Sequence, residues 1–290
     1  MPMIEPTFRK TCRWLLLSGL TLTCAAQAAD AERLSLNRQD GHTVAALAYA
    51  PVGESCRGIA VVSHGVGGSE NAYSYLAKDL AAQGFLTVVP GHQESGLQAL
   101  SNDILKKGLN AGLNALLTNT AAYQGRLQDV AAARAWASQH CAGHLSVLLG
   151  HSMGAATVMI EAGAENKVGV QGGDHFDLYV ALSPQGVGEI FPAHAWQHIQ
   201  KPVLSMTGTR DREVGGRNWQ ARTEAYADLP AGCKWQGIVD GASHMNFAGS
   251  ALSDQKKQLI LGAIRSFLSA AANGQCNLPA RQPGLELTAK

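Results

Sequence analysis

The chain has 290 residues, of which 46% are hydrophobic and 16% are charged, and its formal net charge is +1. This composition is that of an ordinary globular protein with enough apolar material for one large core, and it excludes a fibrous or disordered chain. The near-neutral charge and the lack of a basic cluster argue against nucleic acid or an anionic membrane surface as a partner.

The N-terminus has the pattern of a secretory signal peptide. Basic residues precede a short apolar segment at 14–22, and an Ala-Gln-Ala cleavage site follows at 26–28. The apolar segment is too short for a stable membrane anchor. We therefore predict a signal peptide at 1–28, a periplasmic or secreted protein, and no membrane span after cleavage. The alternatives are an uncleaved anchor and a lipoprotein attached at Cys24, against which Thr23 argues.

The rest of the chain opens with strands and then alternates strands with helices. Apolar runs on either side of Asp40-Gly41 predict a hairpin. Runs typical of fully buried strands follow at 58–63, 85–89, 145–149, 176–182, 202–206 and 234–239. Helical patterns lie between and after them, at 71–82, 98–140, 155–162, 193–200, 219–227 and 253–271.

This alternation predicts one α/β domain at 29–276 with a mostly parallel sheet and helices on both faces. The spacing between the strands at 176–182 and 202–206 leaves room for a short helix but for no large cap domain. The last segment, 277–290, is rich in proline and is expected to be a poorly ordered tail.

The most informative motif is the Gly-x-Ser-x-Gly sequence centred on Ser152. It comes directly after the apolar strand at 145–149 and directly before a helix of small residues. A serine at the apex of a strand–turn–helix is the context of a nucleophile elbow, and Gly150 and Gly154 give the tight turn its room. The elbow, the opening hairpin and the alternation together predict the α/β-hydrolase fold.

A serine nucleophile needs a base, and the base needs a group that orients it. In this fold the acid and then the histidine follow the serine in sequence. Asp211 follows the strand at 202–206, and His244 follows the last predicted strand, so both lie at the sheet edge where α/β sites assemble. Glu213 and Asp240 are rival carboxylates. The preceding strand end, 183–185, offers none.

An acyl-transfer site also needs two N–H donors for the oxyanion. The backbone N–H of Met153 is one candidate, because it directly follows the nucleophile. The second should come from the glycine-rich segment at 63–69, where Val66 is the first choice and Gly67 the alternative. A phosphate-binding loop is disfavoured because no Gly-Lys-Ser/Thr follows.

The sequence does not indicate a metal or an organic cofactor. His194 and His198 have the spacing of metal ligands on a helix, but no third ligand stands out. His151 is expected only to fill the elbow. After export, four cysteines remain in an oxidising compartment, and these can form three different pairings or stay free.

The segments 63–68, 73–77 and 82–85, together with His92, resemble those of the bacterial predicted dienelactone hydrolases. That group is similar to the platelet-activating-factor acetylhydrolases and, more distantly, to bacterial cutinases, and the likeness covers about residues 44–268. The resemblance implies carboxylic ester hydrolysis by the following residues: Ser152, Asp211 and His244, with Val66 and Met153 as oxyanion donors.

Two departures from these families limit the resemblance. The nucleophile here is a serine, whereas dienelactone hydrolases proper use a cysteine. Val66 also stands where polyester-degrading cutinases carry an aromatic residue, which argues against a polymer substrate. The usual strand order of the fold implies two disulfides, one between Cys56 and Cys141 and one between Cys233 and Cys276.

We therefore predict a monomeric, cofactor-independent serine esterase that acts on a small-molecule ester. Its cleft should be open and fairly apolar, with a wall near 97–117 that suits short or medium acyl groups. Two alternatives stay open. One is an acyltransferase or peptidase with the same triad, and the other is a non-catalytic binding protein that retains the fold.

Overall fold

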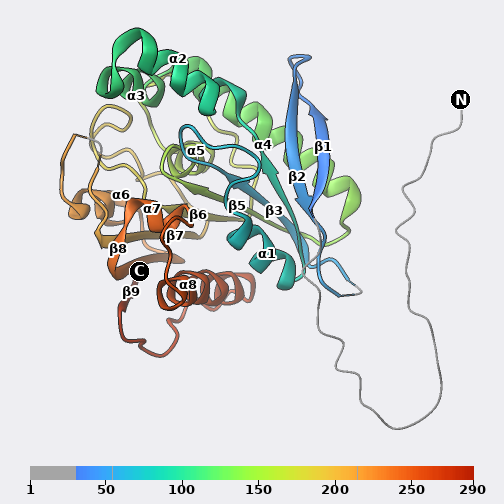
Figure 1. The fold of residues 1–290 in the computed structure, drawn as a ribbon. Coiled ribbons are helices and arrows are strands. Elements are labelled where there is room, and N and C mark those ends of the chain that lie inside the picture. The colour runs from blue at the N-terminus through green and yellow to red at the C-terminus, as the bar shows by residue number, and fades with distance from the viewer. Residues whose placement is uncertain (1–30, 54, 214) are drawn as a thin grey trace, which may run out of the picture.

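The computed structural model describes residues 31–290 except Glu54 and Val214, so the predicted signal peptide lies outside the described residues. A nine-stranded sheet in the order β1-β2-β4-β3-β5-β6-β7-β8-β9 crosses the molecule (Figure 1). The strands are β1 Glu32–Asn37, β2 Thr43–Tyr49, β3 Gly58–Ser63, β4 Phe85–Pro90, β5 Leu145–His151, β6 Leu178–Leu182, β7 Val203–Arg210, β8 Lys234–Ser243 and β9 Leu285–Ala289.

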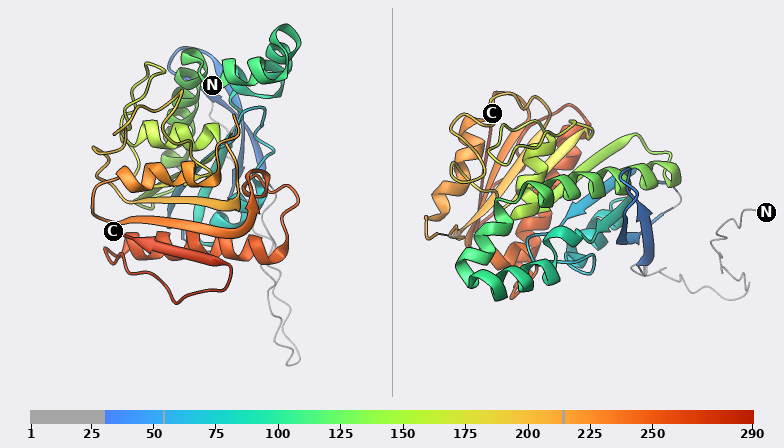
Figure 2. Two further views of the ribbon diagram at one scale, coloured as in Figure 1. Left: turned by 90° about the vertical axis from the view of Figure 1, so that its left-hand side faces the viewer. Right: turned by 90° about the horizontal axis from the view of Figure 1, so that it is seen from above.

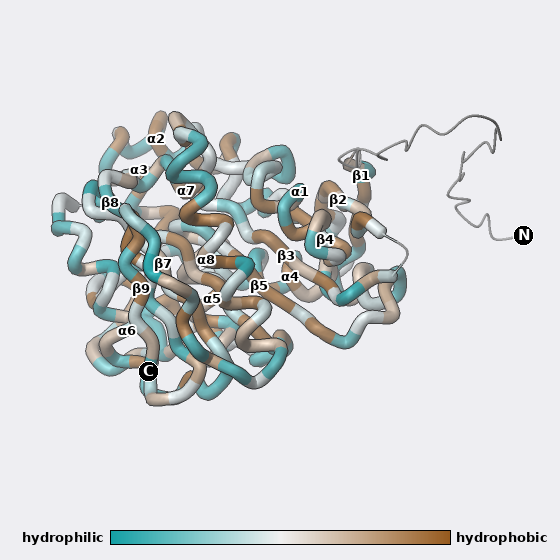
Figure 3. The backbone as a smooth tube through the Cα atoms, turned by 90° about the horizontal axis from the view of Figure 1, so that it is seen from below, coloured by the Kyte–Doolittle hydropathy of each residue, from teal (hydrophilic) through white to brown (hydrophobic). Residues whose placement is uncertain are grey.

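Strands β3 to β8 run parallel to one another, whereas β1 and β2 at one edge and β9 at the other pair antiparallel. The central strands are buried along nearly their whole length. A strand covered on both faces must be apolar throughout, which explains the uninterrupted apolar runs in the sequence. Figure 3 shows these hydrophobic stretches running through the interior of the molecule.

Helices cover both faces of the sheet, as the views in Figure 2 show. The buried residues of α4 (Thr120–His140) and α5 (Met153–Glu161) pack in one core, and those of α1 (Ser74–Ala82) and α8 (Asp254–Ala272) pack in the other. The remaining helices are α2 (Leu97–Lys107), α3 (Leu109–Leu117), α6 (Glu224–Asp228) and α7 (His244–Phe247). Within the part of the chain that is described, no helix has the length and apolar character to cross a membrane.

The expectation of a disordered C-terminal tail was wrong. Residues Leu285–Ala289 form β9, which pairs antiparallel with β8 from Val239 to Trp235. Leu285 is buried, and Leu287 packs against the same core as α8. The strand therefore gains backbone hydrogen bonds to β8 along one edge and an apolar anchor, which outweigh the prolines before it. The folded domain extends to the end of the chain.

The short helix expected at 193–200 is also absent, because the structure has turns there. His194 has a φ of 63°, which a right-handed helix cannot accommodate. His194 Nδ1 lies 3.2 Å from Asp228, and His198 Nε2 lies 3.7 Å from Glu165. The two histidines therefore face different carboxylates instead of sharing a helix face. Among the described residues, no group of three or more His, Cys, Asp or Glu side chains could hold a metal ion.

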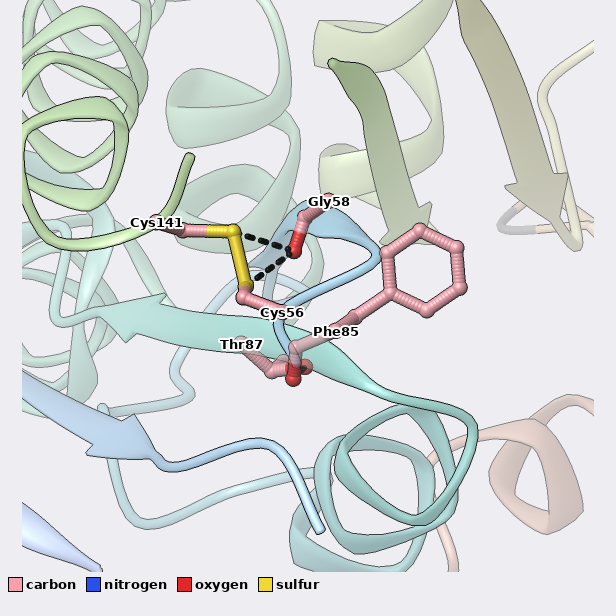
Figure 4. Close-up of a disulfide and its surroundings, with 5 residues drawn as sticks. All are labelled: Cys56, Gly58, Phe85, Thr87 and Cys141. Carbon is pink, nitrogen blue, oxygen red and sulfur yellow. Dashed lines mark hydrogen bonds between the residues drawn. A yellow bond between two sulfur atoms is a disulfide. The ribbon is translucent and has the colours of Figure 1, made fainter. Parts of the chain in front are cut away.

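Two disulfides are present, in the pairing that the fold implies. Cys56 and Cys141 precede β3 and β5, which are neighbouring parallel strands, and their sulfur atoms lie 3.2 and 3.3 Å from the carbonyl oxygen of Gly58 (Figure 4). The second bond joins Cys233, before β8, to Cys276, after α8. The first closes a loop with a sequence separation of 85 residues. In the chain-entropy description a crosslink over such a loop is worth about 4.5 kcal/mol.

Candidate active site

The Gly-x-Ser-x-Gly segment forms a sharp turn between β5 and α5. Ser152 at its apex has a φ of 56° and a ψ of −119°, an uncommon backbone conformation for a residue with a side chain. The glycines are required by close packing, because a Cβ on Gly154 would lie 2.0 Å from the carbonyl oxygen of Ser63. The turn therefore has the strand–turn–helix geometry that the sequence predicts for a nucleophile elbow.

The predicted acid and base meet at the same edge of the sheet. Asp211 comes directly after β7, and His244 is the first residue of α7, directly after β8. His244 Nδ1 lies 2.9 Å from Asp211 Oδ1; the aspartate is fully buried, and the histidine side chain is 26% exposed. When the carboxylate is ionised, Nδ1–H donates this bond, and Nε2 is left as the nitrogen that can accept a proton.

The surroundings of Asp211 favour its ionised form. Burial alone would raise the pKa of this carboxyl, but the hydrogen bond from His244 and the charge of Arg222 outweigh burial and hold the pKa below its usual value. Arg222 Nε lies 2.7 Å from Oδ1, and Thr207 donates to Oδ2 at 3.0 Å. The Asp211 side chain is therefore an anion that is held on both oxygens.

The rival carboxylates are engaged elsewhere. Asp240 accepts a hydrogen bond from Thr209 at 3.0 Å, and Glu213 accepts one from the N–H of Gly186 at 2.8 Å. Of the three candidate acids, only Asp211 contacts His244 in the described structure.

Ser152 and His244 line one cleft with a volume of about 1070 Å³. The cleft is bounded by the glycine-rich segment after β3, the segment 185–190, helix α3, and Glu213, Gly215 and Arg217. The expected wall near 97–117 is thus supplied by α3. No hydrogen bond joins Ser152 Oγ to the His244 ring among the described contacts, and such a bond is often long until a substrate is bound.

The glycine-rich segment 63–68, which we call the oxyanion loop, passes close to the elbow. A Cβ on Gly65 would lie 3.4 Å from the Ser152 Cβ. Within the described structure, the N–H of Val66 donates to no acceptor, and the N–H of Met153 precedes the hydrogen-bond ladder of α5. The N–H of Gly67, the alternative donor, is engaged in a hydrogen bond to the carbonyl of Ser95 at 2.8 Å.

His151 does more than fill the elbow, and sequence reasoning missed this. The Gly65 N–H donates to the Tyr73 hydroxyl at 3.2 Å, which lies 2.7 Å from His151 Nδ1, and His151 Nε2 lies 3.0 Å from the His244 carbonyl oxygen. A carbonyl only accepts, so Nε2 carries the proton, and Nδ1 accepts from Tyr73. Burial, aided by the charges of His244 and Arg222, lowers the pKa of His151 well below its usual value.

A second serine–histidine–aspartate set lies behind the oxyanion loop. His92 Nε2 lies 2.9 Å from Ser63 Oγ, and His92 Nδ1 lies 2.9 Å from Asp129 Oδ2. All three residues are 0% exposed, and none of them lines the cleft. The set therefore has the contacts of a catalytic triad but no access to a substrate, and its effect is to hold the start of the oxyanion loop.

Asp129 should make the stability of the fold depend on pH. Burial raises its pKa to about 7, against the opposing charges of Arg38 and Arg126. An unfolded aspartate loses its proton near pH ~4, so between about pH 4 and 7 the folded chain binds a proton that the unfolded chain has lost. The stability that this site contributes is therefore greatest below about pH 4 and is lost as the pH rises toward about 7.

We expect Asp129→Asn to remove this slope, because asparagine does not ionise and its oxygen can still accept from His92. Urea unfolding at intervals between pH 4.5 and 7.5 measures it. The free energy of unfolding of the variant should rise relative to that of the unsubstituted protein as the pH increases. Parallel curves for the two proteins would contradict the assignment.

Comparison with known proteins supports the fold. The model of a family described as serine aminopeptidase, S33, matches residues 54–184. No curated protein matches the sequence. Among solved structures, a proposed dienelactone hydrolase from Klebsiella pneumoniae is 18% identical with a TM-score of 0.57, and the match covers 84% of this chain and 99% of that one.

Two further structures show the range of proteins with this fold. Est1E from Butyrivibrio proteoclasticus is 15% identical with a TM-score of 0.55, covering 83% of this chain and 99% of that one. An acylaminoacyl peptidase from Pyrococcus horikoshii is 9% identical with a TM-score of 0.61, covering 84% of this chain and 42% of the longer peptidase. With the sheet order and the elbow, these similarities show that the chain has the α/β-hydrolase fold.

Proposed function

We propose that the protein is an exported serine hydrolase that cleaves carboxylic esters. The Ser152 hydroxyl attacks the acyl carbonyl while His244 Nε2 takes its proton, and His244 then gives that proton to the leaving alcohol. In the second step, water attacks the acyl-enzyme while His244 takes a proton from it. His244 then gives that proton to the Ser152 oxygen as the acid is released. The N–H groups of Val66 and Met153 donate to the oxyanion in both steps.

One observation carries this proposal. A buried, ionised Asp211 is hydrogen-bonded to His244, and His244 lines the same cleft as a serine held in the strained conformation of a nucleophile elbow. A carboxylate in this position fixes the imidazole tautomer and stabilises the imidazolium that forms when the serine loses its proton. Export is supported by the two disulfides, which persist in oxidising compartments, and by the predicted signal peptide.

The charges around the cleft favour a neutral ester. Arg217 is paired with Glu213 and Glu224, and Arg222 is paired with Asp211, so neither arginine is left to hold a substrate carboxylate. Glu189 is exposed on the cleft lining and adds a negative charge. Repulsion from this carboxylate, with no free arginine to offset it, should disfavour an anionic ester.

The test is a substrate panel with labelling of the active serine. We expect turnover of p-nitrophenyl esters of short and medium acids, with a higher kcat/KM for a neutral ester than for its carboxylate-bearing analogue. A fluorophosphonate should label Ser152. Turnover of aminoacyl p-nitroanilides without ester turnover would favour a peptidase. The absence of both turnover and labelling would favour a non-catalytic binding protein.

A further inference from the structure

A fully buried arginine lies behind the oxyanion loop. Arg126, on α4, is 0% exposed, and its guanidinium donates to two backbone carbonyls of the loop, those of His64 at 2.6 Å and Gly65 at 3.4 Å. It also donates to the hydroxyls of Ser63 at 3.2 Å and Ser95 at 2.8 Å. Burying a charge costs several kcal/mol unless hydrogen bonds replace its water. The loop supplies most of those bonds.

The Gly65 carbonyl and the Val66 N–H belong to the same peptide unit. A trans peptide is planar, so its C=O and N–H point in opposite directions. The Gly65 oxygen accepts from Arg126 and lies 2.6 Å from His64 Nδ1, so it is held on the interior side of the loop. The Val66 N–H consequently points away from Arg126, to the side that the cleft occupies.

We propose that Arg126 is a positioning residue that fixes the Gly65–Val66 peptide so that the Val66 N–H faces the oxyanion formed at Ser152. A flipped peptide would place the Gly65 oxygen in that position and would leave the buried guanidinium short of an acceptor. The inference rests on the proposed function, because it assigns a role in stabilising the intermediate of ester cleavage.

The remaining contacts of the loop are consistent with this role. The Gly65 N–H donates to Tyr73, and the Gly67 N–H donates to the carbonyl of Ser95, the residue whose hydroxyl accepts from Arg126. The N–H groups of the two neighbouring peptide units are therefore hydrogen-bonded within the protein. The Val66 N–H between them has no acceptor in the described structure.

The test compares Arg126→Met with Arg134→Met. Arg134 lies on the same helix, but its guanidinium packs over the Phe176 ring, with 5.6 Å between its central carbon and the ring centroid, and it does not contact the loop. The readouts are kcat and KM for an ester, and the Ki of a trifluoromethyl ketone, which forms a tetrahedral adduct with the serine.

We expect Arg126→Met to lower kcat by about 10- to 100-fold, somewhat less than deletion of an oxyanion donor does. KM should change by less than about threefold, and the Ki of the ketone should rise by about the same factor as kcat falls, because only the tetrahedral state uses the donor. Arg134→Met should change neither kcat nor Ki. A purely structural role would lower the amount of folded enzyme without this parallel shift in kcat and Ki.

Arg126→Lys keeps the charge and one donor nitrogen, so it tests the same point if the methionine variant does not fold, and it should recover part of kcat. A folded variant of either kind with unchanged kcat and Ki would overturn the proposal, as would a fall in kcat with an unchanged Ki. If the unsubstituted protein turns over no ester, the proposed function fails instead, and the two failures are thereby distinguished.

Discussion

Replacing Ser152 with alanine is expected to lower kcat for ester hydrolysis by about 10⁴- to 10⁶-fold, with the fold intact. The hydroxyl is the group that forms the acyl-enzyme. Among the described residues that line the cleft with His244, no other serine stands at the apex of a strand–turn–helix. The residual rate would come from binding and from the oxyanion donors alone. Initial rates with a p-nitrophenyl ester, together with fluorophosphonate labelling, measure the loss.

The chain offers a matched control in Ser63. Its hydroxyl also lies within hydrogen-bond distance of a histidine that contacts an aspartate, but it is fully buried. Ser63→Ala should keep kcat within about tenfold and should still be labelled, because access decides which serine reacts. Labelling that persists in Ser152→Ala would contradict the assignment of the nucleophile.

Replacing Asp211 with asparagine should lower both activity and stability. Loss of the carboxylate allows the wrong histidine tautomer, which in comparable enzymes lowers kcat by about 10⁴-fold. It also leaves Arg222 buried without its anionic partner, which should lower the free energy of unfolding by about 3 kcal/mol. Because the pKa of Asp211 is depressed, its contribution to stability is present above about pH 4 and is lost as the pH falls through the folded pKa.

His244→Ala separates the loss of activity from the loss of stability. It removes the base but leaves Asp211 in contact with Arg222 and Thr207, and the histidine side chain is partly exposed. We expect a comparable loss of kcat with a change in unfolding free energy within about 1 kcal/mol. Urea unfolding at neutral pH compares the variants. Equal stability of Asp211→Asn and His244→Ala would show that the Arg222 pair does not stabilise the fold.

Much of the architecture could be predicted from the sequence, because its signals are local or ordered along the chain. The elbow at Ser152 is a short motif between a recognisable strand and helix, and Asp211 and His244 follow two buried strands in the expected order. Once the strands are placed, the direction of a parallel sheet brings their carboxyl ends together. The contact between Asp211 and His244 then follows from the order and direction of the strands, and it does not depend on individual side-chain contacts.

The parts that could not be predicted depend on contacts between distant segments. Arg126 lies within a helix, where a buried arginine and a solvent-facing one look alike in a single sequence. The hydrogen-bonded chain from Gly65 through Tyr73 and His151 to His244 joins three segments that are distant in the sequence, and none of its spacings is a recognised motif. Strand β9 is short and follows prolines, and only its pairing with β8 makes it a strand.

The helical pair α2 and α3 lies at the periphery of the fold in Figure 1, and α2 contains no buried residue. By contrast, the sheet, the elbow and the loops that carry Asp211 and His244 are enclosed by the two cores. α3 nevertheless contributes Asn110, Leu113 and Asn114 to the cleft wall. Substitutions in α2 and at the exposed positions of α3 can therefore accumulate without unfolding the domain, whereas Leu116 and Leu117 of α3 are buried. The preference for one ester over another can diverge in evolution, or be changed by engineering, while the reacting groups stay in place.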